Sequence, residues 1–293
     1  MKYLFAVNPV SGKNKAKEKM AKLAERLKEE GIDFITYETQ PYQYADDLRK
    51  VIIESQATHV FAVGGDGTAH EVLNAVIGLD VFFGIVPFGS GNDFARALTL
   101  PKKIDKIVEM IKHNDYITID VGKVEGGRYF LNYISFGFDV VVLKKSIALK
   151  KVFKGAFSYI AALFTTLIKY KCRTIKINGE DKLCYLAAIH NGKYYGGGMK
   201  LNPYAEVNDS LLNLCTVKKI SRLKFVALFP SVFSGKHYRF KKIVSFQSKR
   251  QFTIDTYNDI VLTGIDGEIY ELPNPVTVSV VPESVKLIRY KFN

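Results

Sequence analysis

The chain has 293 residues and a mass of 33.0 kDa, with 47% hydrophobic and 24% charged residues. This length suggests about two domains, and the composition excludes a disordered chain, a collagen and a small disulfide scaffold. Three cysteines without CxxC spacing predict neither a disulfide framework nor a cysteine zinc site, so a reducing cytoplasm is expected. The first apolar run is too short for a signal peptide, and no run reaches the ~18 residues that span a bilayer.

The net charge of +13 is distributed unevenly along the chain. Residues 1–121 carry 15 Lys and Arg against 17 Asp and Glu, whereas residues 122–293 carry 27 against 12. A surface with this excess attracts polyanions such as nucleic acid or an anionic membrane leaflet. The alternative is an ordinary solvated surface, and charge alone does not choose between them.

The first 121 residues alternate between strand-like and helical patterns. Strands are expected at Lys2–Asn8, Phe34–Tyr37, His59–Val63 and Val81–Val86, and helices at Lys13–Glu30, Tyr42–Ser55 and Thr68–Ile77. This βαβα order predicts a three-layer α/β domain over residues 1–121, in which helices cover both faces of a parallel sheet. Ligands of such sheets bind at the carboxyl ends of the strands.

The pattern changes after about Ile117, where short alternating runs are typical of antiparallel strands. They predict an antiparallel β-sandwich or barrel over residues 122–283, and the last strand, near residues 284–293, is a candidate to return to the first domain. Two apolar helical runs interrupt the strands, at Gly155–Ile168 and Leu223–Phe233, the second broken by Pro230. The strand runs are Arg173–Ile177, Leu183–Ile189, Leu211–Val217, Gln251–Asp255, Ile260–Leu262 and Val276–Val281.

Three turns rich in small residues directly follow expected strands of the first domain, at residues 8–13, 64–68 and 89–93. Glycine lets the backbone approach a ligand closely, and the helices that follow offer free N–H groups, a combination that suits phosphates. One such turn alone is more often simple strand-to-helix geometry, but three at one sheet edge favour a phosphate ligand. The P-loop, the GxGxxG fingerprint and the protein-kinase HRD and DFG sequences are absent, so another phosphate-binding scheme is required.

Two of these segments resemble the diacylglycerol kinase catalytic-domain family. GGDGT at 64–68, followed by Glu71, is shared with NAD kinases and sphingosine kinases, whereas PFGSGNDFAR at 87–96 is similar to the lipid-kinase segment that NAD kinases lack. Further matches follow in family order across nearly the whole chain, closest to soluble bacterial diacylglycerol kinases of the YegS type. They are Asn132 with Gly137-Phe138-Asp139, Asn191–Met199 with Pro203 and Ala205, and Asp266-Gly267-Glu268. The resemblance implies an NAD kinase-like first domain and a lipid-substrate β-sandwich.

The resemblance also implies that ATP binds the first domain and that Asp66 holds a catalytic Mg²⁺ or orients the phosphates, since Mg²⁺ prefers oxygen ligands. The alternative for Asp66 is an ordinary Asp-Gly turn residue. His70 departs from the family, which often has asparagine there, so nucleotide affinity or its pH dependence could differ. The implied nucleotide set is Asn8, Pro9, Val10, Ser11, Gly12, Thr39, Gly64, Gly65, Asp66, Gly67, Thr68, Ala69, His70, Ser90, Asn92 and Asp93.

Asp266-Gly267-Glu268 lies between two apolar runs, and Asp-Gly in that position is a strong hairpin signal. From the residues alone a type I′ turn is the favoured interpretation. The resemblance implies instead that this segment supplies the general base, with Glu268 as the base and Asp266 assisting it or contacting metal. Phosphoryl transfer to a hydroxyl needs a carboxylate near the acceptor proton. Two neighbouring carboxylates leave the assignment open.

A second, structural Mg²⁺ is implied at the loop of residues 203–211. The Asp209 carboxylate would bind it together with the backbone carbonyls of Glu206 and Leu211. The family's usual Asp-Gly is Asp209-Ser210 here, and an ordinary turn aspartate is an equally good interpretation.

A lipid acceptor would give the basic second domain a use at an anionic membrane surface. Each of the two apolar helical runs has basic flanks and is too short to span a bilayer. Each is therefore a core helix, the favoured interpretation, or an interfacial segment that could border an acyl-chain groove. We therefore expect a cytoplasmic ATP- and Mg²⁺-dependent diacylglycerol kinase, peripheral at the inner membrane surface, that forms phosphatidic acid. Nucleic acid is not an expected partner, because no recognition motif is present, and a homodimer is left open.

Two alternatives are retained. One is the same chemistry on phosphatidylglycerol, a sphingoid base, undecaprenol or another lipid. The other is a non-catalytic lipid or nucleotide sensor on the same fold, against which the retention of Asp66, Asp266 and Glu268 argues.

Overall fold

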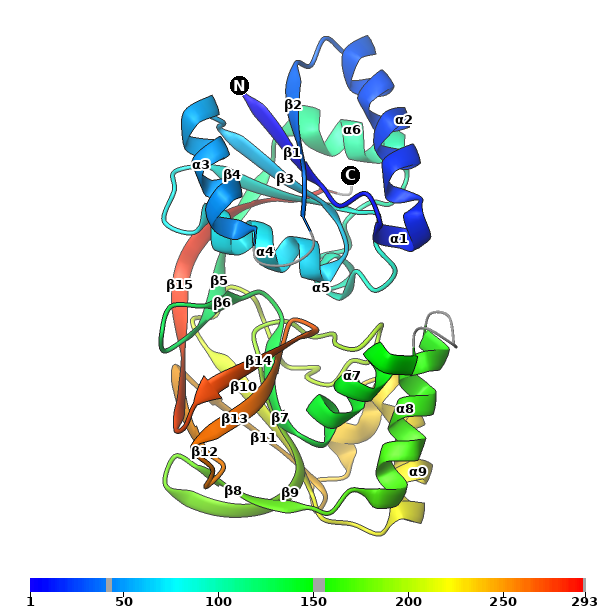
Figure 1. Cartoon of the computed structure of the whole chain (residues 1–293), viewed down its shortest axis with the longest axis vertical. Helices are drawn as coiled ribbons and strands as arrows, with labels where there is room; N and C mark the ends of the chain where they lie inside the picture. The colour runs from blue at the N-terminus through cyan, green and yellow to red at the C-terminus, as the bar shows by residue number, and fades with distance from the viewer. Residues whose placement is uncertain (41–43, 150–155, 292–293) are drawn as a thin grey trace. The chain divides into compact units, whose positions relative to one another are not determined.

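The computed structural model describes residues 1–40, 44–149 and 156–291, without the side chains of 156–159. The chain divides into two compact units (Figure 1). Unit 1 comprises Met1–Val121 and Pro282–Asn293, and unit 2 comprises Gly122–Val281. Strands β5 (Tyr116–Val124) and β15 (Val276–Ile288) continue from one unit into the other, so the last part of the chain belongs to unit 1.

Unit 1 is built on a parallel sheet, as the βαβα order predicted. Its strand order is β15-β4-β3-β1-β2, and each pair is parallel and in regular register. Strands β1 and β3 are buried along their whole length, as expected for a sheet covered on both faces. The bounds are β1 (Tyr3–Val7), β2 (Phe34–Glu38), β3 (His59–Gly64) and β4 (Phe82–Pro87).

Two pairs of helices cover this sheet. Helix α2 (Ala16–Glu29) packs against α6 (Ile104–His113), and α3 (Ala45–Ser55) packs against α4 (Asp66–Val76) (Figure 1). The helix expected from Lys13 begins at Ala16, because Gly12, Lys13 and Asn14 take positive φ values of 60°, 62° and 65°. The start expected for α3 at Tyr42 lies outside the described residues. The short segments α1 (Ser11–Asn14) and α5 (Asp93–Ala97) complete the unit.

Unit 2 is antiparallel, as the alternating runs predicted. The long strand β9 (Glu180–His190) is central, because it pairs with β7, β8 and β10. Strands β13 and β14 form a hairpin that continues the sheet beyond β7. The remaining bounds are β6 (Tyr129–Phe130), β7 (Tyr133–Gly137), β8 (Arg173–Ile177), β10 (Leu212–Lys218), β11 (Val244–Lys249), β12 (Gln251–Asp255), β13 (Ile260–Ile265) and β14 (Glu268–Pro273).

Unit 2 has two hydrophobic cores, one on each face of its central strands. Ile134 and Phe136 of β7 enter the core between the strand layers, whereas Tyr133 enters a second core beneath helices. The helices of this second core are α7 (Phe138–Leu149), α8 (Ala156–Lys169), α9 (Arg222–Leu228) and α10 (Pro230–Phe233), followed by the 3₁₀ turn η1 (Lys236–Arg239). The expected break at Pro230 is confirmed, while α7 was not expected.

The helices of the described residues are all too short or too polar to cross a bilayer. The most apolar of them, α8, has 14 residues.

Candidate functional site

The turns that follow β1, β3 and β4 meet at the carboxyl edge of the unit 1 sheet. A methyl group placed on Gly89 would lie 2.3 Å from Cα of Gly65, and one on Gly12 would lie 2.2 Å from the Phe88 carbonyl oxygen. The Gly89 N–H donates to the Gly64 carbonyl at 2.8 Å. These distances leave no room for a side chain, so the three turns pack backbone against backbone because the contact residues are glycines.

Asn8 ties the first turn to the second. Its side-chain N–H donates to Oγ1 of Thr68 at 3.2 Å, and its Oδ1 accepts the N–H of Val10 at the same distance. Ser11 Oγ lies 3.8 Å from the position that a methyl group on Gly65 would occupy. The sequence-predicted residues Asn8, Ser11, Gly12, Gly65 and Thr68 are therefore brought together.

Asp66 is the first residue of α4, at the helix end where backbone N–H groups lack helical partners and the dipole is positive. Its Oδ1 accepts the N–H of Phe94 at 3.1 Å, which fastens the GGDGT turn to the start of α5. The residue stays partly exposed. Its carboxylate fits a Mg²⁺ ligand, because Mg²⁺ prefers oxygen ligands and phosphates and water would complete the coordination.

The side chains of Asn92, Asp93 and Arg96 hold the third turn in shape. Asn92 donates to the carbonyls of Pro87 and Gly89, at 3.2 and 2.7 Å. Arg96 Nη1 donates to Asp93 Oδ1 at 2.7 Å. Because Asn92 and Asp93 are buried, the geometry gives them a positioning role, and their contact with a nucleotide stays a prediction. Ser90 is exposed at the tip of the turn.

The remaining predicted nucleotide residues differ in accessibility. Thr39 follows β2 and is buried, and its hydroxyl has no hydrogen-bond partner among the described residues. Ala69 and His70 lie inside α4, and the His70 side chain has no exposed surface. The imidazole could therefore touch a ligand only if α4 or its neighbours moved. Pro9 is half-buried and Val10 is 69% exposed beside the first turn.

Asp266 and Gly267 form the two-residue turn of the β13–β14 hairpin, as Asp-Gly predicted. Both have positive φ, 46° and 96°, as a type I′ turn requires. The Asp266 carboxylate is buried and accepts three backbone N–H groups, from Leu131 at 2.7 Å, Asn132 at 2.8 Å and Tyr133 at 3.0 Å. Asp266 thus fixes the chain segment that leads into β7.

Glu268 lies two residues further on, at the first position of β14 and opposite Ile265. Its side chain is partly exposed, in contrast to Asp266. The two carboxylates of the DGE segment therefore have different environments, one committed to backbone donors and one that reaches solvent.

The loop that carries the predicted structural metal site contains an Asx turn. Asp209 Oδ1 accepts the N–H of Leu211 at 3.0 Å, and Ser210 takes a φ of 59°, a conformation that favours glycine. Glu206 forms an ion pair with Lys193 at 2.6 Å. Metal binding by this loop stays a prediction.

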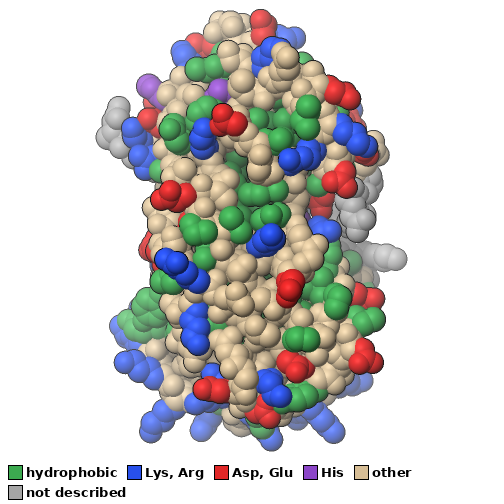
Figure 2. Space-filling view, turned by 90° about the vertical axis from the view of Figure 1, so that its left-hand side faces the viewer, with side chains coloured by type: hydrophobic (Ala, Val, Ile, Leu, Met, Phe, Trp, Pro, Cys, Tyr) green, Lys and Arg blue, Asp and Glu red, His purple; other side chains and the backbone are tan. Residues whose placement is uncertain are grey.

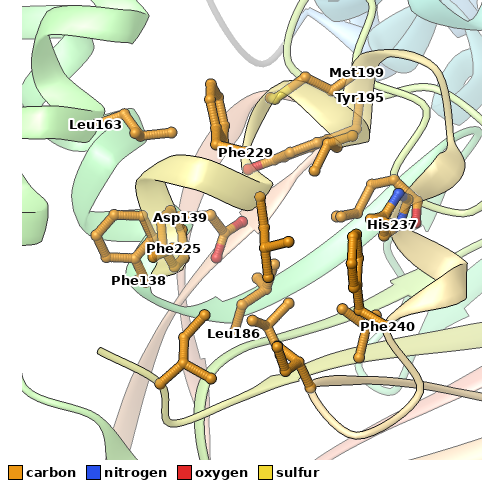
Figure 3. A pocket seen from close by; sticks show the side chains of 17 residues that line it. Phe138, Asp139, Leu163, Leu186, Tyr195, Met199, Phe225, Phe229, His237 and Phe240 are labelled. Atoms are coloured by element: carbon orange, nitrogen blue, oxygen red, sulfur yellow. Dashed lines mark hydrogen bonds between the residues drawn. The ribbon is translucent and has the colours of Figure 1, made fainter. Parts of the chain in front are cut away.

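An apolar cavity lies in unit 2 between the helices and the sheet (Figure 3). Its volume is about 80 Å³. Leu163 of α8 and Phe225 of α9 line it, as do Phe229, which follows α9, and Val232 of α10, with Leu186 of β9 on the sheet side. Both apolar helical runs found in the sequence therefore border one apolar space.

The side chains that line this cavity include one carboxylic acid, Asp139, and one imidazole, His237. Asp139 is 4% exposed, its Oδ1 lacks a hydrogen-bond partner, and burial raises the pKa of its carboxyl to about 6. His237 Nε2–H donates to the Leu201 carbonyl oxygen at 2.8 Å, and burial lowers the pKa of the imidazole. The motif Gly-Phe-Asp drew attention to Asp139, but nothing in the sequence predicted its place in a cavity.

We expect Asp139→Asn to stabilise the protein at pH 8 more than at pH 5. The folded pKa of about 6 exceeds the ordinary value of 3.8, so the folded state binds more protons between these values. The stability that the protonated carboxyl contributes is therefore lost as pH rises from 3.8 to about 6. Above that range the charged carboxylate lowers the free energy of unfolding by on the order of 3 kcal/mol. Asparagine removes the titration.

Urea unfolding of both proteins at pH 5 and pH 8 measures the difference. A difference in unfolding free energy that is the same at both pH values would contradict this account of Asp139.

Family models match both parts of the chain. Residues 2–124 match the model described as diacylglycerol kinase catalytic domain, and residues 132–289 match the YegS C-terminal NAD kinase beta sandwich-like domain.

Curated relatives are similar over nearly the whole length. A protein from Mycobacterium tuberculosis named "Diacylglycerol kinase" is 27% identical over 292 residues, covering 96% of this chain and 93% of that protein. One of the same name from Staphylococcus saprophyticus is 28% identical, covering 89% and 87%. A Yersinia enterocolitica protein named "Probable lipid kinase YegS-like" is 28% identical, covering 94% of each chain.

The fold is similar to a solved structure titled as a diacylglycerol kinase from Bacillus anthracis. The TM-score is 0.78 at 22% identity, and the match covers 98% of this chain and 96% of that one. At this identity the likeness concerns the fold.

Proposed function

The chain belongs to the diacylglycerol kinase family with a YegS-type C-terminal domain, and we propose that it transfers the γ-phosphate of ATP to the free hydroxyl of diacylglycerol. The product would be phosphatidic acid, formed at the inner face of the cytoplasmic membrane. The observation that carries the proposal is the meeting of three glycine turns, with Asp66 at the start of α4, at the ligand-binding edge of a parallel sheet.

The nucleotide is assigned to this edge because its chemistry suits phosphate oxygens. The first N–H groups of α4 are free of helical partners, and the hydroxyls of Ser11 and Ser90 lie on turns that glycine keeps open to close approach. When bound, Mg²⁺ would neutralise charge on the phosphates. Asp66 would supply a carboxylate oxygen to it while its other oxygen keeps the turn attached to Phe94.

Glu268 is assigned as the general base that accepts the proton of the lipid hydroxyl. As the hydroxyl oxygen bonds to the γ-phosphorus, the bond to the β–γ bridging oxygen breaks and ADP leaves. Asp266 is assigned a positioning role. This division is supported by the three N–H groups that Asp266 already accepts and by the partial exposure of Glu268.

The apolar cavity beneath α8, α9 and α10 is assigned to an acyl chain of the acceptor. A mostly apolar space with few polar groups favours a hydrocarbon ligand. Near neutral pH its imidazole, His237, would be uncharged, because burial lowers that pKa. A cavity of this kind favours a kinase whose acceptor is a lipid over one whose acceptor is a small polar alcohol.

Transfer of γ-labelled phosphate from Mg²⁺·ATP into vesicles that contain diacylglycerol tests the proposal. We expect labelled phosphatidic acid from the wild type, and a loss of about 10²–10⁴-fold in kcat for Glu268→Gln, the range typical of a general base. Asp66→Ala should lose activity as well, with a raised KM for ATP.

Glu271→Gln is the matched control, since it makes the same change further along β14 and should retain activity. Labelled product from a total lipid extract but not from diacylglycerol would transfer the proposal to another lipid, such as phosphatidylglycerol, a sphingoid base or undecaprenol. Absence of product from both would contradict a kinase and favour a lipid or nucleotide sensor.

We expect Val232→Phe, which adds a ring inside the cavity, to shift the acceptor preference toward shorter acyl chains. The kcat/KM for a long-chain diacylglycerol should fall about tenfold relative to a short-chain one, which is the scale of a steric clash in an apolar pocket. Val226→Phe is the control, because Val226 is 40% exposed and does not line the cavity. An unchanged chain-length preference in Val232→Phe would remove the cavity from the acceptor site.

A further inference from the structure

Another cavity of unit 2 lies where β7 leaves the sheet, and it shares no lining residue with the apolar cavity. Its volume is about 470 Å³, within the ~300–1,000 Å³ range of ligand pockets. Strand β7 ends at Gly137, whose φ of 101° lets the chain turn into α7. Residues of β7, α7, β8, β13 and the β12–β13 turn line the cavity, together with Tyr170. We name this cavity the strand-end groove.

One wall of the strand-end groove is an edge of β13 that no other strand covers. Strand β14 pairs with β13 along its whole length, whereas β7 pairs only with Thr263–Ile265. The Asp266 N–H donates to the Tyr133 carbonyl on the β7 side. Because backbone groups alternate in direction along a strand, the N–H groups of Ile260 and Leu262 point to the same side. Among the described residues, no strand lies beside them there.

A second wall is an uncovered edge of β8. Strand β9 pairs with β8 along Arg173–Ile177, but β12 pairs only with Lys176 and Ile177. Within the described part of the chain, Arg173–Ile175 therefore has no strand on its other side, and all three of these residues line the groove. A strand edge with unpaired backbone groups is a template for another extended chain.

Hydrophobic side chains in the lining of the groove are exposed. Ile260 is 59% exposed, Val141 45% and Leu262 42%. Natural edge strands usually carry charged residues or proline, which discourage the addition of another chain. The edge of β13 instead reads Ile260-Val261-Leu262. Its side chains and its backbone both favour contact with an extended chain.

The charges in the groove are all positive. Lys144 and Arg173 are exposed in its lining, none of the lining residues is acidic, and neither cation forms an ion pair with a described residue. Both belong to residues 140–179, which hold nine Lys and Arg and no Asp or Glu. Figure 2 shows Lys and Arg side chains along the lower end of the molecule, which is unit 2. Charge complementarity therefore favours an acidic ligand.

We propose that the strand-end groove binds an extended acidic peptide of a partner protein, which adds as a strand beside Ile260–Leu262. Main-chain hydrogen bonds to this edge would hold the peptide, alternate side chains would contact the apolar lining, and its carboxylates would lie near Lys144 and Arg173. A hydrocarbon chain would satisfy the apolar lining but neither the strand edges nor the two cations.

This binding is independent of the proposed reaction, because it needs neither ATP nor a lipid acceptor. The first turn of α7 nevertheless connects the two cavities. Gly137 and Val140 line the strand-end groove, whereas Phe138 and Asp139 line the apolar cavity. A bound peptide would therefore contact the element that also lines the cavity assigned to an acyl chain.

Fluorescence anisotropy with the labelled peptide Glu-Val-Thr-Val-Glu tests the proposal on the full chain. We expect saturable binding with a Kd below about 1 mM, and little binding of Lys-Val-Thr-Val-Lys. Lys144→Glu with Arg173→Glu should weaken binding at least about tenfold, since each exposed ion pair contributes up to about fivefold. Lys249→Glu with Arg250→Glu is the matched control, because these residues do not line the groove, and it should stay within about twofold of the wild type.

Amide hydrogen exchange in protein labelled at isoleucine and leucine tests the strand addition itself. The acidic peptide should slow exchange of the Ile260 and Leu262 N–H groups at least about tenfold, because new hydrogen bonds protect them. Ile35 is the matched control, since it lies on β2, the edge strand of unit 1, and its exchange should not change.

Four results would overturn the proposal. They are equal binding of the acidic and basic peptides, equal losses in the two charge-reversal pairs, unchanged exchange at Ile260 and Leu262, and a wild-type dimer that Lys144→Glu with Arg173→Glu converts to a monomer in sedimentation velocity. The last would show that a second copy of the chain occupies the groove. Unchanged melting temperatures of the variants would show that their losses report on binding.

Discussion

The contact between the glycine turns of unit 1 is the constraint on which the nucleotide site depends. Gly89 lies so close to Gly65 that it cannot carry a side chain, and Gly12 meets the Phe88 carbonyl in the same way. Because of this contact, the ends of β1, β3 and β4 present their turns at one place. Side chains then secure the turns: Asn8 donates to Thr68 and Asn92 to the Gly89 carbonyl. The Asp66 carboxylate accepts the N–H of Phe94.

In unit 2 a buried carboxylate, not a contact between glycines, joins segments that are far apart in the chain. Asp266 gathers the N–H groups of three successive residues, Leu131 to Tyr133, and so attaches the β13–β14 hairpin to the entry of β7. Buried carboxylates are tolerated when donors satisfy them. Glu268, two residues further on at the start of β14, is then held at a defined position while its own side chain still reaches solvent.

Much of this arrangement could be predicted from the sequence, because its causes are local. The βαβα pattern predicted the parallel sheet, Asp-Gly predicted the hairpin and Pro230 predicted the break between α9 and α10. Helix α7 could not be predicted, since Val140–Val142 is a β-branched run and its apolar residues form no single stripe. The three N–H donors to Asp266 and the cavity around Asp139 depend on residues far apart in the chain, which no local pattern reports.

The proposed reaction depends most directly on nucleotide binding at the glycine turns. Calorimetric titration with Mg²⁺ and a non-hydrolysable ATP analogue tests this, with Gly89→Ala as the variant and Gly31→Ala as the control. A methyl group on Gly31 meets no atom within 4 Å, so its strain comes from the φ of 68° and not from contact with the turns. We predict binding to the wild type and to Gly31→Ala, and at least about tenfold weaker binding to Gly89→Ala in a protein that still folds, because the added methyl must push the turns apart. Undiminished binding by Gly89→Ala, or no binding by the wild type, would contradict the account.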